Sequence, residues 1–186
     1  MERPLLGEPL GLDLLNTTWI GRGGPADLLT DTGGMRIWLE QNDLGLPATA
    51  AARSALVTAR EAIRAHTKAS AAELGSAREG TRKELNAALD GLNTVLAWGR
   101  HRPVLGASGP EVVAEVADPD QRAGWLAAVN YLELLTADAS RVRSCAHPEC
   151  VLYFYDTSPK RSRRWCSMAT CGNRAKAARH YARSKD

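Results

Sequence analysis

The feature that most constrains the fold of this chain is a set of four cysteines in its C-terminal quarter. They form two pairs, Cys145 with Cys150 and Cys166 with Cys171, each with four residues between its members, and fifteen residues separate the pairs. Cysteines paired on two short loops can supply four thiolates to one tetrahedral metal ion, and Zn²⁺ prefers such sulfur-rich sites. The spacing therefore predicts one structural zinc ion, with no coordination position left for a water molecule.

Two alternatives to this zinc site stay open at the level of the sequence. His147 lies inside the first loop and can replace a cysteine as a ligand, or the four cysteines are buried free thiols. Disulfides are not expected, because residues 1–8 lack the basic start and the long apolar run of a signal peptide. No stretch approaches the roughly 18 apolar residues of a membrane span. We therefore expect a cytoplasmic protein whose cysteines stay reduced.

The residues around the cysteines predict a β-hairpin followed by a helix. Residues 151–155 form a β-branched and aromatic run, residues 156–159 favour a turn, and residues 163–166 are expected to return as the second strand. Residues 167–183 are expected to form a helix that is capped at its first residue and carries Cys171 in its first turn. The loop Cys145–Cys150, which we call the knuckle, would together with the hairpin and the helix that carries the last ligand make a treble-clef-like zinc finger.

The charge of the chain is divided between its two parts. Residues 140–186 carry a net charge of +8, whereas the remaining residues carry −5. This asymmetry favours a C-terminal segment that binds a polyanion, attached to an acidic body. The candidate DNA-binding residues are the basic side chains between and after the cysteine pairs: Lys160, Arg161, Arg163, Arg164, Arg174, Lys176, Arg179 and Arg183. Because most such contacts are to phosphates, the pattern predicts nucleic-acid binding without predicting a base sequence.

Helical spacing distinguishes two faces of the C-terminal helix. Three basic side chains of this helix, Lys176, Arg179 and Arg183, share one face with Arg174 flanking it, and the alanines at positions 175, 178 and 182 form a second face. The alanine face is expected to pack on the hairpin. Gly172, directly after the last cysteine, permits a close approach of the backbone to a sulfur atom or to a partner.

The first 139 residues predict a mostly helical domain with a small β-element, which together with the finger makes an α+β protein. Capping residues and helical periodicity predict a short helix after Asp31 and longer helices over residues 47–70, 81–98 and 118–138. Residues 103–116 indicate two short strands around a turn at Ser108–Gly109. Residues 7–20 alternate loosely between apolar and polar positions and are expected to be an extended element or strand.

Three polar residues, Asp13, Asn16 and Thr17, interrupt the apolar run near the N-terminus. They either satisfy buried backbone groups near the end of the strand or, together with Trp19, line a pocket for a small-molecule effector. The second interpretation makes the N-terminal domain a sensor. No Gly-rich phosphate loop, H-E-x-x-H or nucleophile-elbow pattern occurs, so we expect no enzyme activity.

Both ends of the chain resemble known families. The stretch Trp165–Arg174 (WCSMATCGNR) closely resembles the signature of bacterial CGNR zinc-finger proteins. The turn Asp156–Ser158 and the basic run Arg161–Arg164 also resemble that family. The opening Gly7–Thr17 (GEPLGLDLLNT) is similar to the opening motif of the ABATE domain, which usually precedes this finger. The resemblance covers essentially the whole chain, and its motifs are most specific at the finger.

The resemblance implies a stress-induced transcriptional regulator whose finger binds DNA. We therefore expect an ABATE-like domain over residues 1–139 and a CGNR-type zinc finger over residues 140–186. Because a single finger buries little area on DNA, we also expect a homodimer that reads two half-sites. The alternative function is a zinc-stabilised module that binds RNA or an acidic protein partner, without sequence-specific binding of DNA.

Overall fold

The computed structural model describes residues 3–21, 23–75 and 79–183. The α-helices in these ranges are α1 (Leu10–Leu15), α2 (Thr32–Gln41), α3 (Ala50–Gly75), α4 (Glu79–Leu96), α5 (Arg122–Asp138) and α6 (Asn173–Arg183). The strands form antiparallel pairs: β1 (Thr18–Gly21) with β2 (Gly24–Asp27), β3 (Gly99–Gly106) with β4 (Gly109–Val116), and β5 (Val142–Ser144) with β6 (Tyr153–Tyr155). Short 3-10 turns cover residues 28–30, 119–121 and 139–141, and a π-type turn covers Met168–Gly172. The predicted α+β fold with a mostly helical N-terminal region is confirmed.

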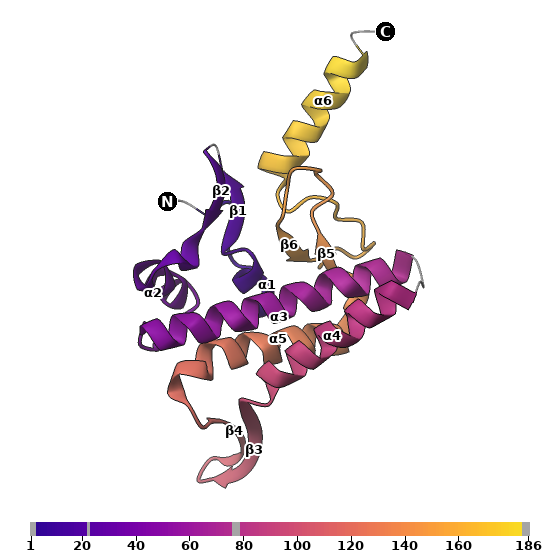
Figure 1. Ribbon diagram of the computed structural model, residues 1–186. Helices are drawn as coiled ribbons and strands as arrows, with labels where there is room; N and C mark the ends of the chain where they lie inside the picture. The colour runs from indigo at the N-terminus through magenta and orange to yellow at the C-terminus, as the bar shows by residue number, and fades with distance from the viewer. Residues whose placement is uncertain (1–2, 22, 76–78, 184–186) are drawn as a thin grey trace.

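Helices α3, α4 and α5 pack together as the body of the molecule (Figure 1). Apolar residues recur at helical spacing on the inner faces, as with Leu56 and Ile63 of α3, which are completely buried. Thr49 starts this helix, because its hydroxyl oxygen accepts a hydrogen bond from the N–H of Ala52 at 2.9 Å. In the ranges that the structure describes, no helix combines the length and the apolar character needed to cross a membrane.

Helix α1 lies directly on α5, and a glycine makes this contact possible. A Cβ atom on Gly11 would lie 2.7 Å from the carbonyl oxygen of Ala127 and 2.8 Å from the Cβ of Tyr131. The N–H of Gly11 also donates a hydrogen bond to Oδ1 of Asn130 at 3.0 Å. These contacts hold the N-terminal segment against the helical body.

The extended structure predicted for residues 7–20 is wrong for the first part of this segment. Residues 10–15 form α1, and only residues 18–21 continue as strand β1. The leucines at positions 12, 14 and 15 of α1 are completely buried, so this short helix contacts protein on every side. Such a helix has neither the 3.6-residue nor the two-residue periodicity by which a sequence distinguishes helices from strands.

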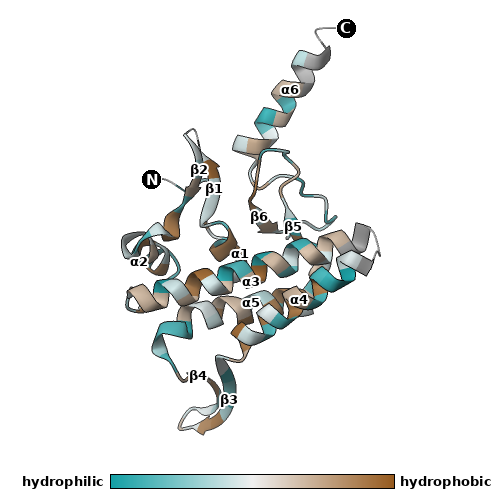
Figure 2. Cartoon of the chain, in the orientation of Figure 1, coloured by the Kyte–Doolittle hydropathy of each residue, from teal (hydrophilic) through white to brown (hydrophobic). Residues whose placement is uncertain are grey.

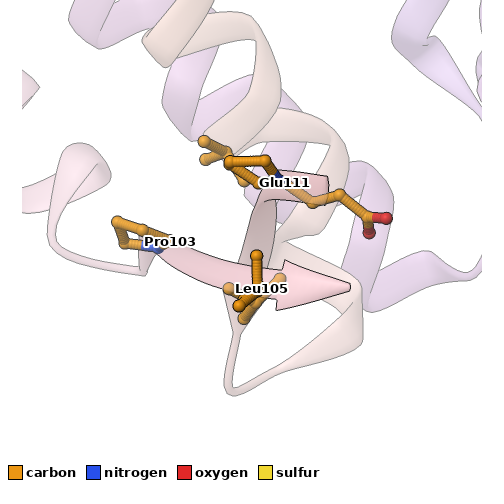
Figure 3. Close-up of a pocket in the computed structure, with 6 residues that line it drawn as sticks. Pro103, Leu105 and Glu111 are labelled. Carbon is orange, nitrogen blue, oxygen red and sulfur yellow. The ribbon is translucent and has the colours of Figure 1, made fainter. Parts of the chain in front are cut away.

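The predicted hairpin between α4 and α5 is confirmed. Strands β3 and β4 pair along their whole length and project from the body on the side opposite to α6 (Figure 1). At the base of the hairpin the ring of His101 meets the ring of Trp125 edge-on, with 5.1 Å between the ring centroids. Near the tip, Leu105 and Val112 are 84% and 66% exposed and border an open cavity of about 480 Å³ (Figure 3).

The C-terminal segment shares the hydrophobic core of the body. Leu152, Tyr153 and Phe154 belong to the same buried cluster as the leucines of α1. Strand β6 pairs with β5, not with residues 163–166 as predicted. The reason is that the loop between the first two cysteines is itself the turn of the hairpin, so the strands lie on either side of the knuckle.

Helix α6 points away from the body (Figure 1), and hydrophilic residues alternate with apolar ones along its first turns (Figure 2). The predicted packing of the alanine face on the hairpin is wrong at Ala178, whose side chain is exposed. Strand β6 of the hairpin packs against helix α1. Helix α6 follows directly on the π-type turn. The side chain of Ala182 lies outside the described residues.

Candidate metal centre and basic surface

The four cysteines converge although they lie on separate segments of the chain. Cys145 follows β5, Cys150 precedes β6, Cys166 lies in the next loop, and Cys171 lies in the turn that leads into α6. Their sulfur atoms all lie within 4.8 Å of one another. The predicted grouping of these four side chains is therefore confirmed.

Two of the sulfur–sulfur distances match the spacing in a tetrahedral zinc site. The Sγ of Cys166 lies 3.8 Å from the Sγ of Cys150 and 3.6 Å from the Sγ of Cys171. In a tetrahedron with Zn–S bonds of about 2.3 Å, two sulfur atoms are roughly 3.8 Å apart. Four sulfur ligands are also typical of a structural zinc ion that leaves no position for water. The cluster therefore fits one structural Zn²⁺.

The electrostatics of the cluster favour a bound cation. A hydrogen bond from Cys166 lowers the pKa of Cys150 to about 5. That hydrogen bond, together with burial and the nearby charge of Cys150, raises the pKa of Cys166, and burial raises the pKa of Cys171 to about 11. One thiolate thus opposes the ionisation of its neighbours. A zinc ion supplies the positive charge that stabilises all four as thiolates.

His147 lies outside this cluster. Its ring nitrogen Nδ1 accepts a hydrogen bond from the N–H of Glu149 at 3.3 Å. Among the residues that the structure describes, the group of metal-ligating side chains consists of the four cysteines. The interpretation of His147 as a ligand is therefore wrong.

A buried carboxylate organises the loop between the second and third cysteines. Asp156 accepts hydrogen bonds from the hydroxyl and the N–H of Ser158, at 2.6 and 2.9 Å, and from the N–H of Arg163 at 2.9 Å. These hydrogen bonds, above all the one from the Ser158 hydroxyl, lower the pKa of Asp156 to about 2. The guanidinium of Arg143 lies 3.4 Å from the same carboxylate. The loop that carries Cys166 is held by these contacts.

Of the predicted DNA-binding residues, Arg163 is part of this scaffold. Its guanidinium donates hydrogen bonds to Oε1 of Glu8 at 2.9 Å and to the carbonyl oxygen of Cys166 at 2.7 Å. It also lies over the ring of Phe154, with Cζ 4.2 Å from the ring centroid. These contacts already engage the guanidinium within the protein. We therefore leave this residue out of the DNA contacts proposed below.

Arg161 is tied to the end of α5. Its Nη2 lies 2.9 Å from a carboxylate oxygen of Asp138, and its carbonyl oxygen accepts a hydrogen bond from Arg143 at 2.9 Å. The side chain is nevertheless 56% exposed. Arg161 thus joins the loop to the body, and part of its charge faces solvent.

Exposed basic side chains lie on the loop and on the first turns of α6. Besides Arg161, they are Lys160, Arg164, Arg174 and Lys176. The Cζ of Arg164 lies 5.3 Å from the centroid of the Trp165 ring, within the range of a cation–π contact. The backbone of α6 continues through Arg179 and Arg183, whose side chains lie outside the described residues.

The polar residues of the N-terminal segment are buried and hydrogen-bonded within the protein. Oδ1 of Asp13 accepts hydrogen bonds from the guanidinium of Arg3 and from the indole N–H of Trp38, both at 2.9 Å. The hydroxyl of Thr17 donates to the carbonyl oxygen of Leu14 at 2.7 Å. These bonds give both side chains a structural role near the end of α1.

Two side chains of the same segment bind the outer edge of β6. The amide of Asn16 donates to the carbonyl of Tyr153 and accepts from the N–H of the same residue, both at 2.9 Å. Oε2 of Glu8 accepts from the N–H of Tyr155 at 2.9 Å. Because alternate residues of a strand direct their backbone groups to the same side, these side chains occupy the place of a neighbouring strand. We call Glu8 and Asn16 the β6 clamp.

Within the clamp, the sequence indicates a backbone-binding role for Asn16 but not for Glu8. The role of Glu8 cannot be predicted from neighbouring residues, because its partner Tyr155 lies 147 residues further along the chain. The sequence feature that could have indicated Glu8 is its position in the same short motif as Asn16, Gly7–Thr17. The described contacts favour the structural interpretation of Asn16, and the small-molecule pocket with Trp19, which is itself buried, stays a prediction.

Comparison with protein families gives a match to each part of the chain. Residues 8–138 match the ABATE family, described as "Putative stress-induced transcription regulator", and residues 141–184 match the CGNR zinc finger. A search of the curated proteins gives no match. The first family covers more than half of the chain, and the second includes all four cysteines. Both resemblances seen in the sequence are therefore confirmed.

Proposed function

Because the chain belongs to the ABATE family and carries a CGNR zinc finger, we propose that it regulates transcription by binding DNA through this finger. The observation that supports the proposal best is the basic surface of the finger, formed by Lys160, Arg164, Arg174 and Lys176. Residues 140–186 carry +8, and the rest of the chain carries −5. Such a surface attracts nucleic-acid phosphates and gains free energy from the counterions that they release.

The metal site would fix the orientation of this basic surface by fixing the start of α6. Helix α6 begins at the turn that holds Cys171, so the zinc ion fixes the start of the helix. The helix then points away from the body (Figure 1). Because the body is acidic, it repels phosphates and favours an approach of DNA to α6. Arg174 and Lys176, on the first turn of this helix, are the contacts that we rank first.

A salt titration of DNA affinity, with the zinc-loaded full-length protein, tests the proposal. Arg174→Ala combined with Lys176→Ala should weaken binding to every duplex sequence. The slope of log K against log salt concentration should become shallower by about 0.9 for each lost phosphate contact. The matched control combines Arg36→Ala with Lys83→Ala, which removes the same charge from exposed positions on α2 and α4. The control should leave the slope unchanged.

Equal affinity and slope in the wild type and the Arg174 and Lys176 variant would contradict the proposal. Selection of bound genomic fragments by the same protein then distinguishes a regulator with preferred sites from a general DNA binder. Binding to RNA or to an acidic protein, without binding to duplex DNA, would favour the alternative function of a zinc-stabilised interaction module.

A further inference from the structure

A cavity beside the zinc-bound knuckle is separate from the metal site. It has a volume of about 300 Å³ and is lined by residues from three segments of the finger: His147, Pro148, Arg164, Trp165, Ala175 and Ala178. The knuckle forms one wall, the segment before Cys166 forms another, and the first turns of α6 form the third. We call this cavity the Trp165 slot.

The walls of the slot are largely apolar and include an aromatic ring. The side chain of Trp165 is partly exposed. On the α6 wall, the small side chains of Ala175 and Ala178 leave the cavity open, because longer side chains would fill it. Gly172 lets the turn close against the tryptophan. A Cβ at this position would lie 3.4 Å from Cδ1 of Trp165 and 2.8 Å from Sδ of Met168. The aromatic wall is thus held in place by the turn before α6.

Positive charge lies beside the slot. Arg164 belongs to its lining, and its guanidinium lies near the ring of Trp165. On α6, Arg174 lies one turn before Ala178 and only about 40° from it around the helix, whereas Lys176 lies about 160° from Ala178 and faces away from the slot. Both side chains are exposed. A ligand that complements this site therefore combines a flat, apolar ring with negative charge.

We infer that the Trp165 slot binds one unpaired nucleobase, while Arg164 and Arg174 beside it bind the adjacent phosphates. This inference rests on the proposed nucleic-acid function and specifies its ligand. A base inside an intact duplex is stacked on both faces and cannot enter a slot between a tryptophan and a proline. A base in a bulge, a single strand or an opened site can stack on the indole. The finger then prefers DNA that is locally unpaired.

Fluorescence anisotropy with three labelled DNAs tests this inference at one salt concentration, with zinc-loaded full-length protein. The DNAs are a short duplex, the same duplex with one unpaired thymine, and one of its strands. Stacking of a base on an aromatic side chain changes affinity by roughly 5- to 150-fold. The wild type should therefore prefer the bulged duplex over the intact duplex by a factor in this range.

Two matched variants identify the slot as the source of the preference. Ala178→Leu fills the cavity without changing charge, at an exposed position that leaves the zinc ligands untouched. It should abolish the preference for the bulged duplex and keep the affinity for the intact duplex. Ala177→Leu adds the same side chain at an exposed position outside the slot and should keep the preference. Zinc content is measured for each variant.

A second readout uses the tryptophan itself. Titration with oligothymidylate should quench part of the tryptophan fluorescence of the wild type, and Trp165→Phe should remove this quenching. Equal affinity of the wild type for intact and bulged duplexes, or an unchanged preference in Ala178→Leu, overturns the inference and leaves the proposed function in place. A failure to bind any of the three DNAs overturns both.

Discussion

Replacing Asn16 by alanine should loosen the attachment of the finger to the helical body. Asn16 is completely buried, and its amide makes two hydrogen bonds of 2.9 Å with the backbone of Tyr153. Alanine removes the donor and the acceptor but leaves the N–H and C=O groups of Tyr153 on the outer edge of β6. Tyr153 is itself buried, so these groups lie away from bulk water.

The expected cost follows from the two backbone groups that lose their partner. A buried polar group without a hydrogen bond costs about 1–3 kcal/mol, so the two groups together cost about 2–6 kcal/mol. Whole domains are stable by about 5–15 kcal/mol, so the variant should lose a large part of its stability. Asn93→Ala, at an exposed position on α4, is the matched control and should change stability by no more than about 0.5 kcal/mol.

Urea unfolding of the zinc-loaded protein measures the change in the free energy of unfolding, and hydrogen exchange locates it. The amide of Tyr153 should exchange faster in Asn16→Ala and at the wild-type rate in Asn93→Ala. A loss below about 0.5 kcal/mol with full protection of this amide would refute the reasoning that Asn16 holds the edge of β6. A stable variant that loses a response to a metabolite would instead support the small-molecule pocket.

Further predictions concern the metal, the packing of α1 and the response to acid. Metal analysis should find one zinc ion per chain, and Cys166→Ser should lose this ion together with the exchange protection of α6; retention of both would contradict the zinc site. Gly11→Ala should lower the free energy of unfolding by roughly 1–3 kcal/mol because its Cβ would collide with α5. Gly91→Ala, at a position on α4 where a Cβ meets nothing, should raise the free energy of unfolding by up to about 1 kcal/mol. Urea unfolding of the two variants measures both changes. Asp156 stabilises the fold in its ionised form, because its pKa is lowered from 3.8 to about 2, so its contribution should be lost as the pH falls through this interval. The difference in stability between the wild type and Asp156→Asn should therefore be widest above about pH 4 and should narrow toward pH 2.

The parts of the fold that could be predicted from the sequence are those determined by neighbouring residues. Asp118 caps the turn before α5 through a 2.9 Å hydrogen bond from the N–H of Asp120, and this pattern is visible in the sequence. The leucine spacing of residues 81–98 similarly indicates α4. The four cysteines could be assigned to one metal site because the two members of each pair have only four residues between them.

The rest of the site depends on residues that are far apart in the chain. Nothing near Asn16 indicates a bond to Tyr153, which lies 137 residues later. The net charge of the finger includes Arg163 but does not distinguish an arginine that binds Glu8 from one that faces solvent. Strand β5 has three residues, too few to show a period, so its pairing with β6 could not be predicted.

The shared core has a consequence for how such proteins can be recombined. The two family matches meet between residues 138 and 141, yet a chain cut there would divide the buried cluster that Leu152, Tyr153 and Phe154 share with the leucines of α1. It would also free the outer edge of β6, where an exposed strand edge is a template for pairing with another chain. A finger transferred to a different helical domain therefore requires the Gly7–Thr17 motif to accompany it. Sequence segments from opposite ends of the chain thus form one structural unit.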